Sequence, residues 1–306
     1  MSTARKIAKN TTVLYIAQII TYLLGFFTTV YTVKYLSVDN YGILSTALAL
    51  AGIYTVFNDL GLGTLTVREV ARNKSLTKKY VGNTTVMKLF LSLFTFLLTV
   101  FTVYVIGYNQ ITVIVIYILT ASYIFNAFSA IFYAIFQSNQ KMEYQSVATV
   151  LNSVTMLTGT LMAINFHLDV IAFAFIYLIA NGISFIFIAL TYVWKIYIPN
   201  VELDLSFWKP TIKEALPLSI SSVFGVLVFR VDTVMLSIIK GAVAVGFYNA
   251  SYKLMEALIF LPQVYTTSIF PVFSMLYFSS KKPLKNAYVK SFKYLTLLSL
   301  PIAVGT

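Results

Sequence analysis

Apolar runs of twenty or more residues recur along this chain, and they limit its fold more than any other feature of the sequence. The hydrocarbon core of a bilayer is about 30 Å thick, and an α-helix needs about 20 apolar residues to cross it. With 59% hydrophobic residues, 10% charged residues and a mean hydropathy of +0.83, the chain is far more apolar than a soluble domain. The runs therefore predict an all-α polytopic membrane protein.

The apolar pattern divides the chain into eight full spans and the beginning of a ninth. The first run is too long for the apolar region of a cleavable signal peptide. The third carries almost no polar pattern, so we expect it to face lipid. The expected spans are residues 11–35, 41–67, 84–106, 111–137, 146–166, 170–194, 215–239 and 244–275, with a ninth that begins near residue 294 and stops at 306, too short to cross.

The distribution of basic residues predicts how the chain crosses the membrane. The formal charge is +12, but Lys and Arg gather in the leader and in alternate loops, while the intervening loops hold only Lys34 and Lys240. By the positive-inside rule this places the N-terminus in the cytoplasm, and odd-numbered spans run outward. We therefore expect a multi-pass protein of the cell membrane and no nucleic-acid partner.

Two classes of site are disfavoured by composition. The chain has no cysteine, so it cannot form a disulfide or a thiolate metal site. It has one histidine, which argues against a histidine-based metal site.

Charged residues lie well inside the seventh and eighth spans. Arg230 and Asp232 occupy the seventh, and an Arg in mid-span costs about 2.5–3.5 kcal/mol on insertion scales. The eighth carries Asn249, Lys253 and Glu256 on one helical face. One interpretation is a pair of structural ion pairs, Asp232 with Lys253 and Arg230 with Glu256. The other is a charged seam that lines a cavity for an anionic substrate or a coupling ion.

An internal repeat relates the two ends of the chain. Residues 11–42 align without a gap on residues 215–246, an offset of 204 residues, mainly through hydropathy. The repeat predicts two lobes of like orientation: a six-helix lobe at 1–196, a cytoplasmic linker at 197–213 and an incomplete second lobe at 214–306. We interpret the chain as a fragment or a truncated product of a protein with at least twelve spans.

Two sequence blocks carry a resemblance to a known family. The first is Asp59-Leu-Gly-Leu-Gly-Thr-Leu-Thr-Val-Arg68-Glu69-Val-Ala-Arg72, and the second includes Pro217-Leu-Ser, Arg230-Val-Asp232 and Val245-Gly-Phe-Tyr-Asn. Both resemble polysaccharide flippases, in the superfamily that also holds multidrug-and-toxin (MATE) extruders and lipid II flippases. The resemblance implies a two-lobed helical bundle around a central cavity, with the second lobe truncated here.

The same resemblance implies a function. A flippase of this type moves a polyprenyl-diphosphate-linked oligosaccharide from the cytoplasmic to the outer leaflet by alternating access, for cell-surface glycan synthesis. Its partners would be the lipid-linked oligosaccharide, membrane lipid and glycan polymerase or ligase machinery. It would need no cofactor beyond coupling to H⁺ or Na⁺, and it would not be an enzyme.

We assign expected roles to ten residues on this basis. Guanidinium suits phosphate because it donates paired hydrogen bonds. Polar side chains at helical spacing would bind sugar hydroxyls. For the gate residues, helix capping and ion pairing are the structural alternative. The expected substrate-binding residues are Arg230, Lys253, Asn249, Asn126 and Gln18; the coupling residues are Asp232 and Glu256; the cytoplasmic gate residues are Asp59, Arg68 and Glu69.

Three other functions are weighed against the flippase. A cation-coupled multidrug extruder of the same superfamily would favour acidic residues in the first lobe, whereas the membrane-depth Arg and Lys lie in the second. A membrane-embedded glycan polymerase or ligase needs sizeable outer loops, and those expected here are only a few residues long. A membrane scaffold that does not transport is the third alternative.

Overall fold

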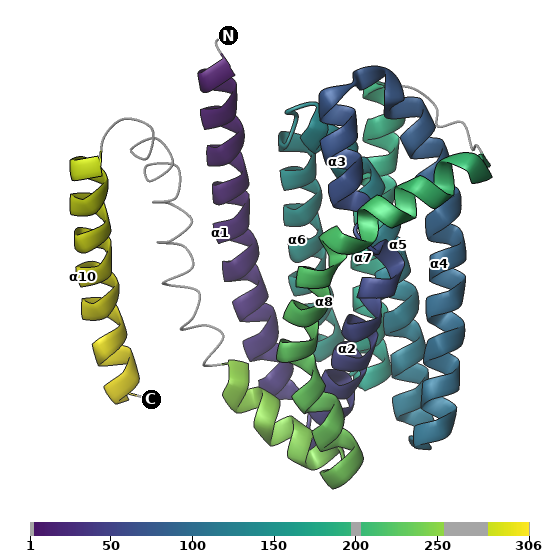
Figure 1. Cartoon of the computed structure of the whole chain (residues 1–306). Coiled ribbons are helices and arrows are strands. Elements are labelled where there is room, and N and C mark those ends of the chain that lie inside the picture. The colour runs from purple at the N-terminus through teal and green to yellow at the C-terminus, as the bar shows by residue number, and fades with distance from the viewer. Residues whose placement is uncertain (1–2, 197–202, 254–280, 306) are drawn as a thin grey trace. The chain divides into compact units, whose positions relative to one another are not determined.

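The computed structural model describes residues 3–196, 203–253 and 281–305, and the regular structure in these ranges is helical throughout. Seven stretches of it are long and apolar enough to cross a membrane, which confirms the predicted all-α class. Residues 242–253 are also helical, and the rest of the eighth predicted span lies outside the described residues. The labelled helices are α1 (Thr3–Tyr35), α2 (Val38–Asp59), α3 (Leu62–Arg72), the 3-10 turn η1 (Lys74–Leu76), α4 (Thr77–Ile106), α5 (Gln110–Ser138), α6 (Glu143–Asn165), α7 (Val170–Lys195), α8 (Leu205–Lys240) and α10 (Lys281–Gly305) (Figure 1).

Short polar caps begin several of these helices. The side chain of Asn109 accepts the N–H of Thr112 at 2.8 Å at the start of α5, and Asp169 accepts the N–H of Ala172 at 3.2 Å at the start of α7. Asn and Asp are preferred in this position because they satisfy N–H groups that have no partner within the helix. The predicted starts at residues 111 and 170 therefore agree with the starts of α5 and α7 to within one residue, whereas α1, α4 and α8 begin seven to ten residues before their predicted spans.

The second predicted span is broken near one end. Leu60 and Gly61 adopt left-handed backbone conformations, with φ of 44° and 80°, and separate α2 from α3. A Cβ on Gly61 would overlap the carbonyl oxygen of Ala215 in α8, so glycine permits both the turn and this close approach. The sequence predicted one continuous helix here, and the close approach of α8 accounts for the difference.

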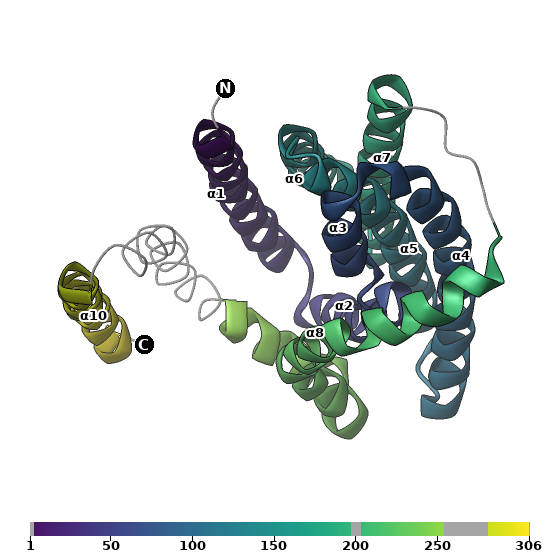
Figure 2. The ribbon, with the colours of Figure 1, turned by 45° about the horizontal axis from the view of Figure 1, so that its top comes forward.

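The helices of the first packed unit pair in a definite order. α5 packs most extensively on α7, α1 and α7 both pack on α6, and α2 packs on α5 and α8. Figure 2 shows α8 passing across α4 and α2. The main apolar core lies at the end that the positive-inside rule assigns to the cytoplasm, and it includes Leu65, Phe136, Ile188 and Tyr192.

One face of α4 is exposed and apolar along most of its length. Its large side chains recur at helical spacing, as expected for a surface that meets lipid. The third span was expected to face lipid, and this face of α4 agrees with that expectation. The opposite face does not, because it buries Lys88 and several hydroxyls. The exposed side chains are Leu89, Phe90, Leu93, Phe94, Leu97, Phe101 and Tyr104.

Packing divides the described chain into two units, residues 1–247 and 248–306. This division does not follow the predicted lobe boundary at residue 214, because α8 packs along α2 and α3. The second half of the predicted 197–213 linker is already part of α8, which begins at Leu205. In the second unit, α10 begins at Lys281, well before the predicted ninth span. The lobe assignment remains a prediction.

Candidate functional site

Arg230 lies on α8 and faces the first six spans. Its Nε lies 3.9 Å from the position that a Cβ on Gly52 of α2 would take. It also lies near Tyr123 of α5 and Tyr177 of α7. The guanidinium is therefore directed toward the surface formed by α2, α5 and α7. A cation that binds a substrate between the helices would have to point in this direction.

The other charged residues expected near Arg230 are only partly described. Asp232 is half-buried, and its Oδ1 accepts the N–H of Thr233 at 2.6 Å. Two residues apart on a helix, Arg230 and Asp232 do not share a face. Asn249 and Lys253 belong to the second packed unit, and Glu256 lies outside the described residues. The proposed pairings of Lys253 and Glu256 therefore remain predictions.

The two remaining expected sugar-binding residues are exposed. Gln18 is exposed on α1, and Asn126 is exposed on α5. Asn126 lies three residues after Tyr123, so both occupy one face of α5. Asn126 therefore lies about one helical turn from Tyr123 along α5.

Most of the other polar residues on α5 have a structural role. The Oγ of Ser122 accepts Asn181 Nδ2 at 2.7 Å, and Asn181 Oδ1 accepts Asn152 Nδ2 at 2.9 Å. The Tyr133 hydroxyl lies 3.3 Å from Ser184 Oγ. These bonds join α5, α6 and α7. Ser122 and Tyr133 therefore hold helices together.

A partly buried ion pair joins α2 to α4. The Lys88 side chain is 1% exposed, and its Nζ donates to Asp59 Oδ1 at 2.7 Å and to the carbonyl of Ala127 at 2.9 Å. Both carboxylate oxygens of Asp59 also accept the N–H of Gly63, at 3.2 and 3.4 Å. Asp59 thus neutralises a membrane-embedded lysine and caps the start of α3. Sequence reasoning missed Lys88, although it lies about as far inward from the basic loop as Asp59 does.

Arg68 and Glu69 form a second, more exposed network at the predicted cytoplasmic end. Arg68 Nε donates to Glu69 Oε1 at 2.6 Å, and Arg68 Nη2 donates to Glu214 Oε2 on α8. Arg72 Nη1 also reaches Glu69 Oε1, at 3.3 Å. The network therefore ties α3 to α8. Arg68 and Glu69 lie together as expected, Asp59 is engaged separately with Lys88, and Glu214 is a partner that sequence reasoning did not identify.

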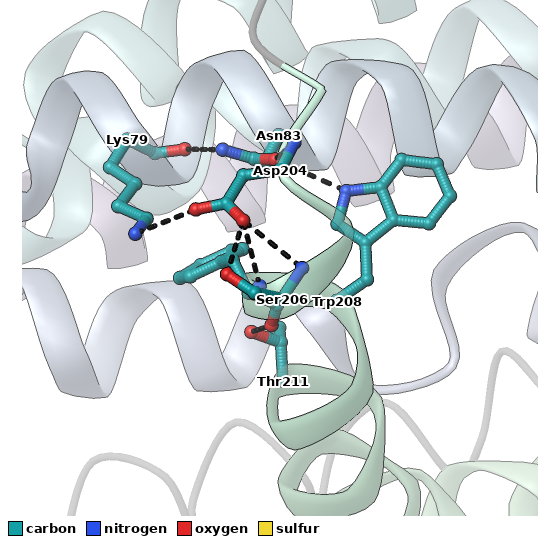
Figure 3. Close-up of polar contacts among 7 residues, drawn as sticks. Lys79, Asn83, Asp204, Ser206, Trp208 and Thr211 are labelled. Atoms are coloured by element: carbon teal, nitrogen blue, oxygen red, sulfur yellow. Dashed lines mark hydrogen bonds and ion pairs between the residues drawn. The ribbon is translucent and has the colours of Figure 1, made fainter.

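The start of α8 is anchored on α4 (Figure 3). Asp204 Oδ2 pairs with Lys79 Nζ at 2.9 Å, and Asn83 Oδ1 accepts both the N–H of Asp204 at 2.9 Å and Trp208 Nε1 at 3.1 Å. The Ser206 hydroxyl and the Lys79 ammonium, which both donate to the carboxylate, lower the pKa of Asp204 to about 2. The second half of the predicted 197–213 linker is thus fixed against a transmembrane helix.

At the opposite end of the molecule, α2 and residues 242–246 meet backbone to backbone. A Cβ on Gly42 would overlap the carbonyl oxygen of Ala242, and a Cβ on Gly246 would overlap the carbonyl oxygen of Val38. Nearby, the Tyr108 hydroxyl lies 2.7 Å from Ser237 Oγ and ties the α4–α5 turn to α8. At the predicted outer end, α2 is therefore held close to residues 242–246, and the α4–α5 turn is held to α8.

An apolar crevice of about 530 Å³ lies between α2 and α8. Its wall is almost entirely aliphatic or aromatic, and Lys213 is the charged side chain among the described lining residues. Such a space accommodates a hydrocarbon chain better than a sugar. The lining includes Ile53, Val56, Phe57, Leu216, Val223 and Leu227.

The sequence matches the family described as "Polysaccharide biosynthesis protein" over residues 7–277. The chain belongs to the polysaccharide biosynthesis protein family. No protein in the curated set matches this member of the family. The match covers all the described helices that can cross a membrane, so it applies to the whole arrangement around Arg230.

Solved structures place this polysaccharide biosynthesis protein in the MATE fold. An inward-facing multidrug resistance MATE transporter of the MOP superfamily is 17% identical, with a TM-score of 0.62 over 90% of this chain and 69% of that one. A MATE protein in complex with MaD5 is 15% identical, with a TM-score of 0.63 over 98% and 72%. A MOP superfamily transporter from Pyrococcus furiosus is 17% identical, with a TM-score of 0.57 over 97% and 70%.

Family and fold agree with the resemblance described from the sequence. The chain belongs to the polysaccharide biosynthesis protein family and has the MATE architecture. The chain spans about 70% of the length of the solved transporters.

Proposed function

We propose that this protein moves a polyprenyl-diphosphate-linked oligosaccharide from the cytoplasmic to the outer leaflet by alternating access. The family supports a role in polysaccharide biosynthesis, and the fold supports transport. The observation that carries the proposal is the position of Arg230. It is a cation at membrane depth, directed toward α2, α5 and α7.

In this mechanism, Arg230 binds the diphosphate or an acidic sugar. Guanidinium can donate two parallel hydrogen bonds to phosphate oxygens, and the attraction is stronger in a cavity of low dielectric than in water. Lys253 adds a second positive charge. Protonation or Na⁺ binding at Asp232 or Glu256 then changes the local charge and releases the substrate. Gln18, Asn126 and Asn249 contact sugar hydroxyls.

The polyprenyl tail needs an apolar path while the glycan crosses. The crevice between α2 and α8 supplies one, since its described lining is apolar apart from Lys213 and Ser219. Lys213 belongs to the half of α8 that joins the predicted cytoplasmic end. In the proposed mechanism the tail enters beside this lysine, and the head group moves toward Arg230.

The two ends of the molecule close by different contacts. At the predicted cytoplasmic end, the Arg68–Glu214 bond holds α8 to α3 and acts as the gate with Glu69. Because Asp204 and Trp208 also fix the start of α8 to α4, the pivot lies further along the helix. We place it at Pro217, where proline removes a helical hydrogen bond and permits bending.

Substitution of Arg230 tests the proposal in cells that depend on this gene for a surface glycan. We expect Arg230→Ala to abolish export and lipid-linked glycan to accumulate in the cytoplasmic leaflet. Arg230→Lys should rescue export poorly, because an ammonium cannot make the paired hydrogen bonds. Met235→Ala, at an exposed position on the same helix, is the matched control.

Two outcomes would contradict the proposal. Normal export by both Arg230 variants would show that this residue does not bind the substrate. A deletion strain that exports glycan normally but becomes sensitive to cationic drugs would favour the multidrug extruder.

A further inference from the structure

A pocket of about 440 Å³ opens where η1, the α5–α6 turn and the end of α7 meet. It shares no residue with the surroundings of Arg230. Four of its lining side chains are lysines, and no described lining residue is acidic. The lining comprises Lys74, Ser75, Thr77, Lys78, Asn139, Lys141, Lys195 and Ile196.

Two of these ammonium groups are held in place. Lys74 Nζ donates to the carbonyl of Ser138, and Lys195 Nζ lies 3.6 Å from the centre of the Trp194 ring. The first turn of the 30-residue helix α4 adds its partial positive charge beside Thr77. The carboxyl ends of α5 and α7 bring partial negative charge, which four full positive charges exceed. The pocket is therefore suited to an anion.

The depth of the pocket matches the head-group layer. Its residues lie at the ends of spans, since one candidate span begins at Lys74, another ends at Ser138 and a third ends at Lys195. Trp194 is 79% exposed beside it, and tryptophan favours the level of the head groups. The positive-inside rule assigns this side of the membrane to the cytoplasm.

An apolar stripe leads away from the pocket along α7. Its members recur every three or four residues, so they lie on one helical face that ends at Trp194. Acyl chains packed along this face would leave a phosphate at the level of the lysines. The exposed members are Ile179, Ile183, Ile186 and Leu190.

We propose that this pocket binds the head group of an anionic phospholipid of the cytoplasmic leaflet. The phosphate lies among Lys78, Lys141 and Lys195, and the acyl chains lie along the α7 stripe. The lipid is a bound component of the first lobe and not the transported molecule. This inference goes beyond the proposed function and does not depend on it.

Quenching of Trp194 by brominated lipid tests this proposal directly. The protein has two tryptophans, so a Trp208→Phe background leaves Trp194 as the reporter. Full-length protein in mixed micelles is titrated with brominated phosphatidylglycerol and, separately, with brominated phosphatidylcholine. We expect Trp194 to be quenched at lower mole fractions of phosphatidylglycerol.

Matched charge variants then separate the pocket from general surface charge. Lys141→Gln with Lys195→Gln removes two pocket charges, and Lys209→Gln with Lys285→Gln removes two exposed charges from the same predicted side. At roughly fivefold in affinity per lysine, the pocket pair should weaken phosphatidylglycerol binding about 25-fold and the control pair about twofold or less. The single variants replace the pocket pair if its melting temperature shows that it does not fold.

Three results would overturn the proposal. Equal quenching by the two lipids would remove the preference for an anion. Equal losses in the pocket and control variants would reduce the effect to surface charge. Displacement of phosphatidylglycerol by millimolar inorganic phosphate would identify a site for free phosphate instead of a lipid.

Discussion

Gly42 lies in α2, and Gly246 lies in the helical segment that follows α8. The two glycines approach each other with no side chain between them. The relationship is reciprocal, because Gly42 faces the carbonyl of Ala242 while Gly246 faces the carbonyl of Val38. Residues 38 and 242 differ by 204, and so do residues 42 and 246. This is the offset of the internal repeat, so equivalent positions of the two repeats contact each other across a local two-fold relationship.

The first prediction concerns this contact. Gly42→Ala would push Cβ into the carbonyl of Ala242, and overpacking of this kind costs about 1–3 kcal/mol. We expect a lower melting temperature in detergent and weaker transport. Gly182→Ala is the control, because nothing lies within 4 Å of the Cβ that it adds. Its better helix propensity should leave stability equal or raise it by up to about 1 kcal/mol. Equal effects of the two variants would refute the close contact.

The second prediction concerns the Lys88–Asp59 pair, whose two members should not be equally sensitive. Lys88 is 1% exposed, whereas the Asp59 side chain is 38% exposed. Asp59→Ala leaves a buried ammonium without its carboxylate, and an unsatisfied buried donor costs about 1–3 kcal/mol, or more when it is charged. Lys88→Met leaves a carboxylate that water can reach and that still caps Gly63.

Thermal unfolding of the two single variants and the double variant measures this asymmetry. Asp59→Ala should be the least stable of the three. Adding Lys88→Met to it should recover part of the loss, because the unpaired ammonium is then gone. If Lys88→Met is instead the more damaging single change, Asp59 is not serving as the counter-charge.

The third prediction concerns the anchor of α8 at low pH. The folded-state pKa of Asp204 is about 2, below its ordinary value of 3.8. The ionised carboxylate of Asp204 therefore makes its full contribution to the stability of the folded state above about pH 4. This contribution is lost as the pH falls through about 2. Asp204→Asn should lack this component, and the difference between wild type and variant should shrink between pH 4 and pH 2.

Fluorescence of Trp208 in a Trp194→Phe background reports this anchor, because its Nε1 bonds to Asn83. Other carboxylates titrate in the same range, so only the difference between wild type and Asp204→Asn is informative. A difference that stays constant from pH 5 to pH 2 would contradict a depressed pKa.

The fourth prediction concerns the Arg68–Glu214 bond between α3 and α8. Arg68→Glu places like charges opposite each other and should impair glycan export. Combining it with Glu214→Arg restores opposite charges and should recover much of that export. Export assays on the two single variants and the double variant test this. No recovery in the double variant would mean that Arg68 acts through Glu69 or through a substrate contact instead.

The helices could be predicted because hydropathy is a sum over many residues. An apolar run of twenty residues has few ways to be satisfied in a bilayer, so single substitutions hardly change the assignment. The break at Leu60 was not predictable in the same way. It depends on the close approach of Ala215, and such a tertiary contact leaves no periodic signal.

Lys88 illustrates why the candidate site was only partly predicted. One lysine changes the mean hydropathy of a long apolar run very little, so the span appeared featureless. Its partner Asp59 precedes it by 29 residues, on the other side of a basic loop. Counting inward from that loop places both charges at a similar depth, and this comparison would have paired them. Glu214 gave no such signal, because it lies at the boundary between the predicted linker and the second lobe, outside the predicted seventh span.

The Lys88–Asp59 pair also constrains how the protein is synthesised. If the translocon released α4 alone, the ammonium of Lys88 would be exposed to hydrocarbon, at a free-energy cost of about 2.5–3.5 kcal/mol. The counter-charge is already present when α4 emerges, because Asp59 lies in the preceding span. The two helices can therefore enter the bilayer together with the charge of Lys88 already paired to Asp59. The order of the two charges along the chain thus couples membrane integration to the first step of tertiary assembly.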